Sequence, residues 1–510
     1  MNIPLTLKSK AVETIVRARR KLYPESRTRR MLPEGYRQMG NLINQLRSPI
    51  QTEYVPGRRY LFNALPDGAW KGQPCFIVGG GPSLQGFDFE SLRGQRVIAV
   101  NRAFENLPFA DILFAIDPQY YNWCRTAKIG GDTREQAAIF KKWTLFTGFK
   151  VWLDTNRTNI GDIHLLPHGP LYETPPYKNT MREGIATYNF SGPAAVNLAM
   201  CLGANPIYLL GFDCRHDNKK THYHSGYKST ANEIKLQQLA LDFGKLKKKT
   251  DTLGFQVVNL TPGSLIKAFP KQAIKDIIPK LQKRPERKWR VISFYTKGTG
   301  YEQEIKKLEA SLKRFNIPYH FYGCKQYGNW RANLNCKSAS ILAAFKKYPN
   351  EDIVFLDADA IVRQYPELFD RLSFTGLHDM AAHFQIYAQS VPGGSLLSGT
   401  LWFRNCERTI GLVKLWHEIG LNNPYVRHQH CLRLAIEEWR KSGRTVNVFR
   451  MPREYTCIFD YRGNRHVEPV IEHFQASRRL KREVGKSHLI DSNFLHIPNK
   501  ISVPVRMGNA

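Results

Sequence analysis

Paired cysteines and long apolar runs are both missing from this 510-residue chain. Its nine cysteines are scattered, and no two of them have the C-x-x-C spacing typical of structural zinc sites and redox motifs. We therefore expect free thiols in a reducing compartment. No stretch approaches the roughly 18 to 20 apolar residues that a membrane-spanning helix needs. The first residues also lack the apolar core and cleavage site of a secretory signal, so we expect a cytoplasmic protein without a transmembrane segment.

Acidic residues are scarce relative to basic ones. The chain has 43 Asp and Glu against 75 Lys and Arg, which gives a formal net charge of +32. A charge excess of this size favours polyanionic partners such as DNA, an anionic membrane surface or an acidic glycan. Hydrophobic residues make up 42% of the chain and aromatic residues 12%, which excludes a mainly disordered protein.

The chain divides into a basic lead-in and two segments with the same alternation of strands and helices. Residues 1–72 form a basic N-terminal extension, which is either an arm that binds phosphates or a solvated helix that packs on the rest of the protein. Residues 73–275 and 290–510 each predict a Rossmann-like α/β domain, and the polar, proline-bearing residues 276–289 predict the linker between them. The expected fold class is therefore α/β, with two tandem Rossmann-like domains and a basic tail.

Short apolar segments predict the strands of both domains. In the first domain they are 75–78, 96–100, 112–116, 206–210 and 256–260, with a helix at 192–202. In the second domain the strands are 290–295, 318–322, 353–356 and 396–403, with helices at 302–315, 336–348, 410–419 and 431–441. Polar residues or glycines follow several of these strands directly. In a doubly wound parallel sheet, ligands bind beyond the carboxyl ends of the strands.

The most specific signal is a pair of aspartates after a hydrophobic strand. Residues 353–356 read Ile-Val-Phe-Leu and run into Asp-Ala-Asp at 357–359. Mg²⁺ and Mn²⁺ prefer oxygen ligands, and two carboxylates at a strand tip can hold such an ion against the pyrophosphate of a nucleoside diphosphate. The alternative is that both aspartates only cap the following turn.

Residues from about 289 to 480 resemble the GT-A nucleotide-diphospho-sugar glycosyltransferases. The resemblance rests on the opening strand 291–295, the Asp-Ala-Asp motif, and the sequence Ser-Gly-Thr-Leu-Trp-Phe-Arg at 398–404. It implies that the second domain is GT-A-like and that the substrate is a nucleotide-sugar donor.

That resemblance implies roles for individual residues. Asp357 and Asp359 would bind Mn²⁺ or Mg²⁺, and the late His473 would complete the metal site. Lys337 would help to bind the donor, and Gln429, which opens a helix, would take part in catalysis.

The position before the glutamine departs from the family. Relatives often carry an acidic residue there, and this chain has His428. Asp379 and Glu437 are the nearby carboxylates that could take over the role of a catalytic carboxylate.

A glycine-rich turn follows the first predicted strand and reads Gly-Gly-Gly-Pro-Ser-Leu at 79–84. Glycines let the backbone approach a phosphate and point N–H groups at it. Together with segments 207–213 and 261–265, the turn resembles the family of bacterial lipooligosaccharide sialyltransferases and the archaeal pterin pyrophosphokinase-like domain. The resemblance covers most of 73–270. It implies nucleotide binding by six residues: Gly79, Gly81, Ser83, Asn101, Ser191 and Gly192.

Two departures from that family concern the same region. Gly80 stands where the sialyltransferases carry an asparagine, and segment 222–228 matches their catalytic histidine segment only loosely. His222 or His224 could act as a general base, because imidazole titrates near neutral pH. Both could equally be surface histidines.

The leading prediction is a metal-dependent GT-A glycosyltransferase that moves a sugar from a nucleotide-sugar donor to a polyanionic acceptor. The pairing of the two families with a basic arm resembles phage or prophage proteins. The first choice of acceptor is therefore a modified base in phage DNA, extruded from the helix. Aromatic and basic residues cluster in a way that fits a nucleic-acid groove, at 58–60, 330–331, 439–441 and 478–482.

Three alternatives remain open. A glycosyltransferase acting on a surface glycolipid or polysaccharide at the inner membrane face is favoured by the sialyltransferase resemblance. A non-catalytic nucleic-acid-binding or virion-associated protein would carry a degenerate transferase fold. The first domain could instead have pyrophosphokinase activity that does not depend on Asp357.

Overall fold

The computed structural model describes residues 59–130, 132–154, 163–216, 222–224, 233–325, 336–385, 394–423, 426–464, 466–476 and 480. The three β-sheets described below belong to one compact unit, made of Arg58–Gln385 and Leu396–Ala510. Residues 1–58 of the predicted basic extension and the tail after residue 480 lie outside the described residues. The predicted aromatic-basic cluster at 330–331 also lies outside them. Among the described helices, none combines the length and the apolar character that crossing a membrane requires.

In the first half of the described chain, seven strands form a parallel sheet. They are β1 (Cys75–Val78), β2 (Arg96–Val100), β3 (Ile112–Ala115), β4 (Phe149–Leu153), β5 (His164–Leu166), β6 (Ile207–Leu210) and β7 (Val257–Asn259). Their order in space is β5-β4-β3-β2-β1-β6-β7, and all neighbours pair in parallel. The strand order reverses between β1 and β6, which defines a topological switch point. The predicted α/β fold with a parallel sheet is confirmed.

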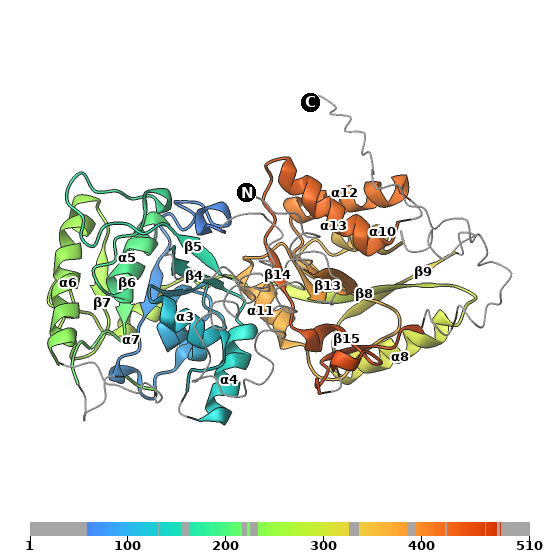
Figure 1. The fold of residues 1–510 in the computed structure, drawn as a ribbon, viewed down its shortest axis with the longest axis horizontal. Helices are drawn as coiled ribbons and strands as arrows, with labels where there is room; N and C mark the ends of the chain where they lie inside the picture. The colour runs from blue at the N-terminus through green and yellow to red at the C-terminus, as the bar shows by residue number, and fades with distance from the viewer. Residues whose placement is uncertain are drawn as a thin grey trace, which may run out of the picture. The chain divides into compact units, whose positions relative to one another are not determined.

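Helices cover both faces of this sheet (Figure 1). Helices α5 and α6 pack on one face, and α3 and α4 pack on the other. The bounds of these helices are α3 (Pro118–Arg125), α4 (Thr133–Thr144), α5 (Ser191–Cys201) and α6 (Glu233–Thr252). Because the strands are buried on both faces, β1 and β3 are continuous apolar runs rather than alternating patterns.

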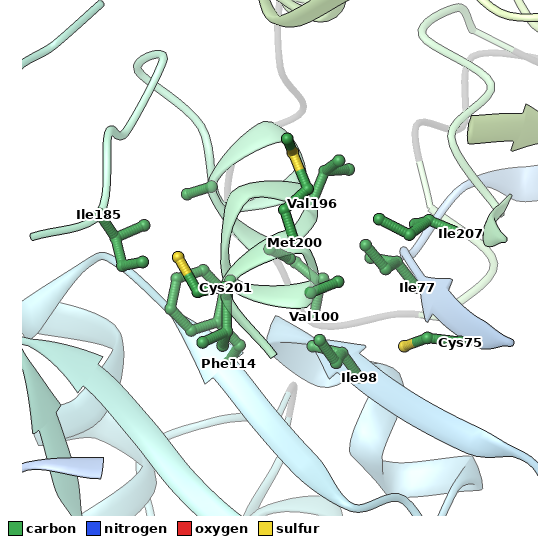
Figure 2. Packing of buried hydrophobic residues seen from close by; sticks show 14 of the residues in the cluster. Cys75, Ile77, Ile98, Val100, Phe114, Ile185, Val196, Met200, Cys201 and Ile207 are labelled. Carbon is green, nitrogen blue, oxygen red and sulfur yellow. The ribbon is translucent and has the colours of Figure 1, made fainter. Parts of the chain in front are cut away.

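Helix α5 forms the centre of one of these layers. Figure 2 shows Val196 and Met200 of α5 in the same buried cluster as Ile77 of β1 and Val100 of β2. Every residue of α5 is buried, which accounts for its scarcity of polar side chains. This packing fixes the N-terminus of α5 close to the carboxyl ends of the strands.

In the second half, the described residues form a six-stranded mixed sheet. Its order is β14-β12-β13-β10-β8-β9, with β10 parallel to β8 and antiparallel to β13. The strands are β8 (Lys288–Thr296), β9 (Tyr319–Cys324), β10 (Glu351–Leu356), β12 (Met380–Gln385), β13 (Ser395–Phe403) and β14 (Val448–Arg450). A small sheet combines β11 (Ala360–Val362), β16 (Ile471–His473) and β15 (Cys457–Ile458). The helices of this half are α8 (Tyr301–Arg314), α10 (Cys336–Lys347), α11 (Glu367–Thr375), α12 (Glu407–Asn422) and α13 (His428–Lys441). The short helix α7 (Ile274–Ile277) precedes them and packs against the first sheet.

Two differences from the expected elements have identifiable causes. Strand β4 was not anticipated, because Lys150 interrupts its apolar run. The structure buries that lysine and places its Nζ 4.6 Å from the centre of the Trp143 ring. Strand β8 begins at Lys288, inside the predicted linker 276–289, because its first residues already pair with β10. The Arg290 guanidinium also lies 2.8 Å from the Glu351 carboxylate.

Candidate functional site

The acidic pair of the second sheet lies where β10 ends. Leu356 of β10 is opposite Thr400 of β13 in the antiparallel ladder. The Asp357 amide donates to the carbonyl of Gly399 at 2.9 Å, and the Ala360 amide donates to the carbonyl of Asp357 at 2.9 Å. The first bond extends the ladder by one residue and the second closes a turn. Both aspartates are therefore held just beyond the edge of the sheet.

His473 reaches the same place from the far end of the chain. It lies opposite Ala360 in the antiparallel pair β11–β16. Its Nε2 is 2.8 Å from Oγ1 of Thr400, and its Nδ1 is 4.0 Å from Oδ1 of Asp359. The other oxygen of Asp359 accepts a hydrogen bond from the Ala476 amide at 2.6 Å. These contacts hold Nε2 of His473 and Oδ2 of Asp359 in place. They leave Nδ1 of His473 and Oδ1 of Asp359 facing each other.

The three predicted metal ligands lie close together and could hold a single ion. Asp357, Asp359 and His473 each offer one ligand atom, and these atoms lie within 4.8 Å of one another. Metal–ligand bonds of about 2.1 Å place two ligands of one ion roughly 3 to 4 Å apart. Two carboxylates and an imidazole are also donors that bind divalent ions.

Lys337 of α10 balances part of the negative charge. Its Nζ lies 2.7 Å from Oδ1 of Asp357 and 2.9 Å from the carbonyl oxygen of Ser398. Burial raises the pKa of Asp357; Lys337 opposes this rise, and Asp359 adds to it. Burial acts on Asp359 as well, but the neighbouring His473 ring and the hydrogen bond from the Ala476 amide outweigh it and lower the pKa of Asp359. Asp359 is therefore the firmer anion of the pair, and the charge of Asp357 depends on its surroundings.

A cavity of about 210 Å³ opens beside the acidic pair. The Asp357 side chain keeps 39% of its surface exposed there, although protein atoms surround it closely. The cavity is also lined by Gln429, near the start of α13, and by the aromatic residues Phe294, Tyr295 and Tyr301. The structure thus brings Gln429 together with Asp357, Asp359 and His473. Lys337 reaches the same site through its ion pair with Asp357.

The absence of a side chain at Gly399 shapes this site, which the sequence alone did not indicate. A Cβ atom at Gly399 would lie 2.9 Å from Cε1 of His473 and 3.3 Å from Oδ2 of Asp357. Glycine therefore leaves the space between two of the three ligands open. The only signal in the sequence was the run of small residues, Ser-Gly-Thr, inside an otherwise apolar strand.

His428 is a second group whose role emerged only from the structure. Its Nε2 lies 2.7 Å from Oγ of Ser398, and it lines the same cavity. Burial, together with the nearby charges of Lys337 and Arg427, lowers its pKa well below the usual value. His428 is therefore neutral at pH 7 and adds no negative charge to the cavity.

The two carboxylates considered as substitutes belong to other contacts. Asp379 accepts from Nε of Arg408 at 2.8 Å and from the Asn447 amide at 2.7 Å. Glu437 lies 3.7 Å from Nε of Arg433 on the same helix. Neither carboxylate is among the described residues that line the cavity. Both carboxylates are engaged in polar contacts within the second half of the chain.

A second cavity, also of about 210 Å³, lies at the carboxyl edge of the first sheet. Its walls come from the turns that follow β1, β2 and β6 and from the start of α5. It brings together most of the residues predicted for the first domain: Gly79, Gly81, Asn101, Ser191, Gly192, His222 and His224. The cavity coincides with the topological switch point, where open α/β sheets bind their ligands.

Ser83 is not among the described residues that line this cavity, but its partner Asp213 is. The Ser83 amide and hydroxyl donate to the two carboxylate oxygens of Asp213 at 3.0 and 2.8 Å. Burial raises the pKa of Asp213, and the bonds from Ser83 oppose this rise. A Cβ atom on Gly81 would lie 1.8 Å from Oδ2 of Asp213, so only glycine fits at that position.

His222 and His224 lie side by side above the glycine turn. Their ring centres are 5.1 Å apart. A Cβ atom on Gly80 would lie 3.1 Å from Cδ2 of His222 and 3.4 Å from Nε2 of His224. The histidine pair thus leaves little room for a side chain at position 80. Burial and the charge of Arg102 lower the pKa of His222 to about 4, so it is neutral at pH 7.

Comparisons with known proteins gave matches among solved structures and no sequence match. No family model matches the chain, and no curated protein matches its sequence. Among solved structures, the chain is similar to a glycosyltransferase involved in the glycosylation of the major capsid of PBCV-1. The match has 15% sequence identity and a TM-score of 0.30, and it covers 39% of this chain and 100% of that one. The sialyltransferase-like and phage resemblances stay predictions.

Proposed function

We propose that the chain is a GT-A-type glycosyltransferase that uses a nucleotide-sugar donor and a divalent ion. The observation that carries this proposal is the convergence of Asp357, Asp359 and His473 on one cavity. Mn²⁺ suits the mixed oxygen and nitrogen donor set better than Mg²⁺, which prefers oxygen ligands alone. When bound, the ion would neutralise the charge that develops on the leaving diphosphate.

Protein groups around the ligands would orient them. The Thr400 hydroxyl engages Nε2 of His473, which leaves Nδ1 to face Asp359 and the ion. Lys337 holds Oδ1 of Asp357, which leaves Oδ2 available. The lysine also adds a fixed positive charge next to the position proposed for the diphosphate.

Gln429 lies in the same cavity, and its amide can both donate to and accept from sugar hydroxyls. This capacity supports the proposed catalytic role of Gln429. For the acceptor, the net charge of +32 favours a polyanion. A modified base in DNA is our first choice, and a glycolipid or polysaccharide at an anionic membrane face is the alternative.

We also propose that the cavity at the switch point binds a nucleotide. The turn at Gly79–Gly81 brings the main chain to the cavity without interfering side chains, so a phosphate can approach it closely. The amides of Gly79 and Gly81 already donate to the carbonyl oxygens of Leu210 and Gly211. Since His222 is neutral at pH 7, it would contact the ligand as a hydrogen-bonding group. A weakly basic imidazole is a poor general base at that pH.

The donor site is tested by turnover of a panel of nucleotide sugars with Mn²⁺. The full-length chain is compared with Asp359→Asn and with the control Glu437→Gln, which removes a carboxylate outside the cavity. We expect donor hydrolysis by the wild type and the control, and a loss of about 100-fold or more in Asp359→Asn. Equal turnover in all three proteins would contradict the proposed metal site.

The acceptor is tested by transfer of a labelled sugar to DNA with modified bases and to anionic liposomes containing glycolipid. Label on DNA, together with salt-dependent retention on DNA, supports the first choice of acceptor. Label on the glycolipid supports the membrane alternative. DNA retention without turnover of any donor would favour a non-catalytic nucleic-acid-binding protein.

A further inference from the structure

Two phenylalanine rings stack on each other beside the proposed donor cavity. The ring centres of Phe459 and Phe474 are 5.5 Å apart, and the ring planes differ in direction by only 21°. Phe459 follows Ile458, and Phe474 lies between His473 and Gln475; all three of these neighbours line the cavity. The two phenylalanines, which we call the phenylalanine pair, are therefore immediate neighbours of the cavity wall.

The pairing of β15 with β16 brings the two rings together. Ile458 lies opposite His473 in this parallel pair, and the next residue after each of them is a phenylalanine. The Phe459 amide donates to the carbonyl of His473 at 3.2 Å, and the Phe474 amide donates to the carbonyl of Asp359 at 3.2 Å. Main-chain hydrogen bonds thus tie the phenylalanine pair to two of the three proposed metal ligands.

Arg363 packs against one ring of the pair. Its guanidinium carbon lies 5.6 Å from the centre of the Phe474 ring, within the range of a cation–π contact. The Arg363 amide donates to the carbonyl of Val470 at 2.8 Å, and its guanidinium forms an ion pair of 2.7 Å with Glu472. The Arg363 side chain is nevertheless 45% exposed, so it can also meet an anionic group that arrives from solvent.

The other ring of the pair is open to solvent. Phe459 is 51% exposed although Phe474 stacks on it. Single exposed apolar residues are ordinary on a protein surface. This one is held in place by a stacked ring and a main-chain hydrogen bond, so it loses little conformational freedom when a ligand binds. Exposed aromatic faces next to basic residues stack on the bases of single-stranded nucleic acids.

The position of the pair suits an acceptor better than a donor. Neither phenylalanine is among the described residues that line the cavity, so a ligand on the rings would approach the cavity from outside. We propose that the phenylalanine pair stacks on a nucleobase of single-stranded DNA, next to the base that receives the sugar. Arg363 would contact a phosphate of the same strand.

This inference rests on the proposed transfer to DNA and adds the place where the acceptor strand is held. The net charge of +32 favours a polyanionic strand over a neutral glycan.

The test is binding of a short fluorescent single-stranded DNA, compared with an abasic strand of the same length and charge. Fluorescence anisotropy of the full-length chain is measured at constant ionic strength and without donor. We expect the wild type to bind the strand with bases more tightly than the abasic strand. Phe459→Ala should weaken binding of the strand with bases about tenfold or more, as loss of a base–aromatic stack does, and leave the abasic strand unaffected. Phe459→Trp should keep the binding of the wild type.

A matched control separates stacking at this place from general attraction. Phe140→Ala removes an exposed phenylalanine of α4 and should leave both affinities unchanged. If Phe459→Ala does not fold, Phe459→Leu, which keeps an apolar side chain without the ring, is measured instead. Equal binding of the strand with bases by the wild type and the folded variant overturns the proposal. Equal affinity of the wild type for the two strands overturns it as well.

Two further outcomes locate a failure. Binding of a neutral oligosaccharide that depends on Phe459, without base-dependent binding of DNA, would assign the pair to a glycan and overturn the proposal. Donor turnover with Mn²⁺ is measured on the same preparations. Turnover without base-dependent DNA binding contradicts only the role of the phenylalanine pair, whereas base-dependent DNA binding without turnover supports that role and contradicts the proposed transfer.

Discussion

Nζ of Lys337 and Oδ1 of Asp357 lie 2.7 Å apart at the end of β10. The lysine side chain is only 1% exposed, whereas the aspartate side chain is 39% exposed. The lysine therefore depends on this partner for its buried charge, and the aspartate can still reach a ligand with its other oxygen. Any ion that binds Asp357 shares this carboxylate with an internal cation.

Replacing this lysine tests the relationship directly. Lys337→Met removes the ammonium that lowers the pKa of Asp357 and that would face the diphosphate. We expect donor turnover to fall about 10- to 100-fold, as when a catalytic charge partner is lost. Turnover with Mn²⁺ is the measurement, and Lys346→Met, at an exposed position of the same helix, is the control. Equal turnover in the two variants would contradict a role for Lys337.

Gly399 provides a test that leaves all three ligands in place. In Gly399→Ala the new methyl group would lie 2.9 Å from Cε1 of His473. We expect this crowding to cost about 1 to 3 kcal/mol of unfolding free energy and to weaken Mn²⁺ binding. Urea unfolding and Mn²⁺ titration measure the two effects. Gly244→Ala, where a Cβ would meet nothing within 4 Å, should not weaken Mn²⁺ binding. Unchanged Mn²⁺ affinity in Gly399→Ala would show that the ion does not need this space.

The metal site should lose affinity as the pH falls. Burial raises the pKa of Asp357, so a proton competes for this carboxylate at a pH at which an ordinary aspartate is still ionised. The pKa of Asp359 is lowered, so Asp359 stays ionised longer. Below the pKa of Asp357, Mn²⁺ affinity should fall about tenfold per pH unit. Calorimetric titrations across the acidic range measure this slope.

The matched variant for this pH dependence is Asp357→Asn. It should bind Mn²⁺ more weakly than the wild type at neutral pH and show a shallower decline on acidification. An equally steep decline in Asp357→Asn would mean that another ligand, and not Asp357, takes up the proton.

The hydrogen bond from Ser83 to Asp213 should stabilise the fold at the edge of the first sheet. Ser83→Ala removes the hydroxyl that donates to Asp213 at 2.8 Å, which leaves one oxygen of a buried carboxylate without this bond. We expect a loss of about 1 to 3 kcal/mol in the free energy of unfolding. Ser91→Ala, which removes an exposed hydroxyl bonded only to a nearby carbonyl, should change it by less than about 0.5 kcal/mol. A similar small loss in both variants would contradict the positioning role of Ser83.

Two of the three candidate metal ligands could be predicted from the sequence because both directly follow one apolar strand. The apolar run before Asp357 predicts a buried strand, and two aspartates beyond its end must emerge at the sheet edge. The contribution of His473 followed only from a resemblance. Nothing near His473 in the sequence shows that it pairs opposite Ala360, since that pairing depends on the register of two strands that are far apart in the chain.

Other features lay beyond any local pattern. Lys150 interrupts an apolar run in the sequence. In the structure it is a residue of a strand, and its ammonium group lies over the Trp143 ring. Gly80 looked like a departure from a family, and the structure places a pair of histidines where its side chain would be. In both cases the partner comes from a different element, so the sequence around the residue carries no information about it.

The sequence by itself determined the α/β class, the positions of most strands, and the presence of two carboxylates at the end of one of them. These follow from apolar runs and turn residues, whose effects act within a few positions along the chain. Only the tertiary structure decided that Lys337 pairs with Asp357, that Gly399 leaves room beside His473, and that Ser83 donates to Asp213. Such contacts depend on strand order and register, which are set by the packing of the whole chain.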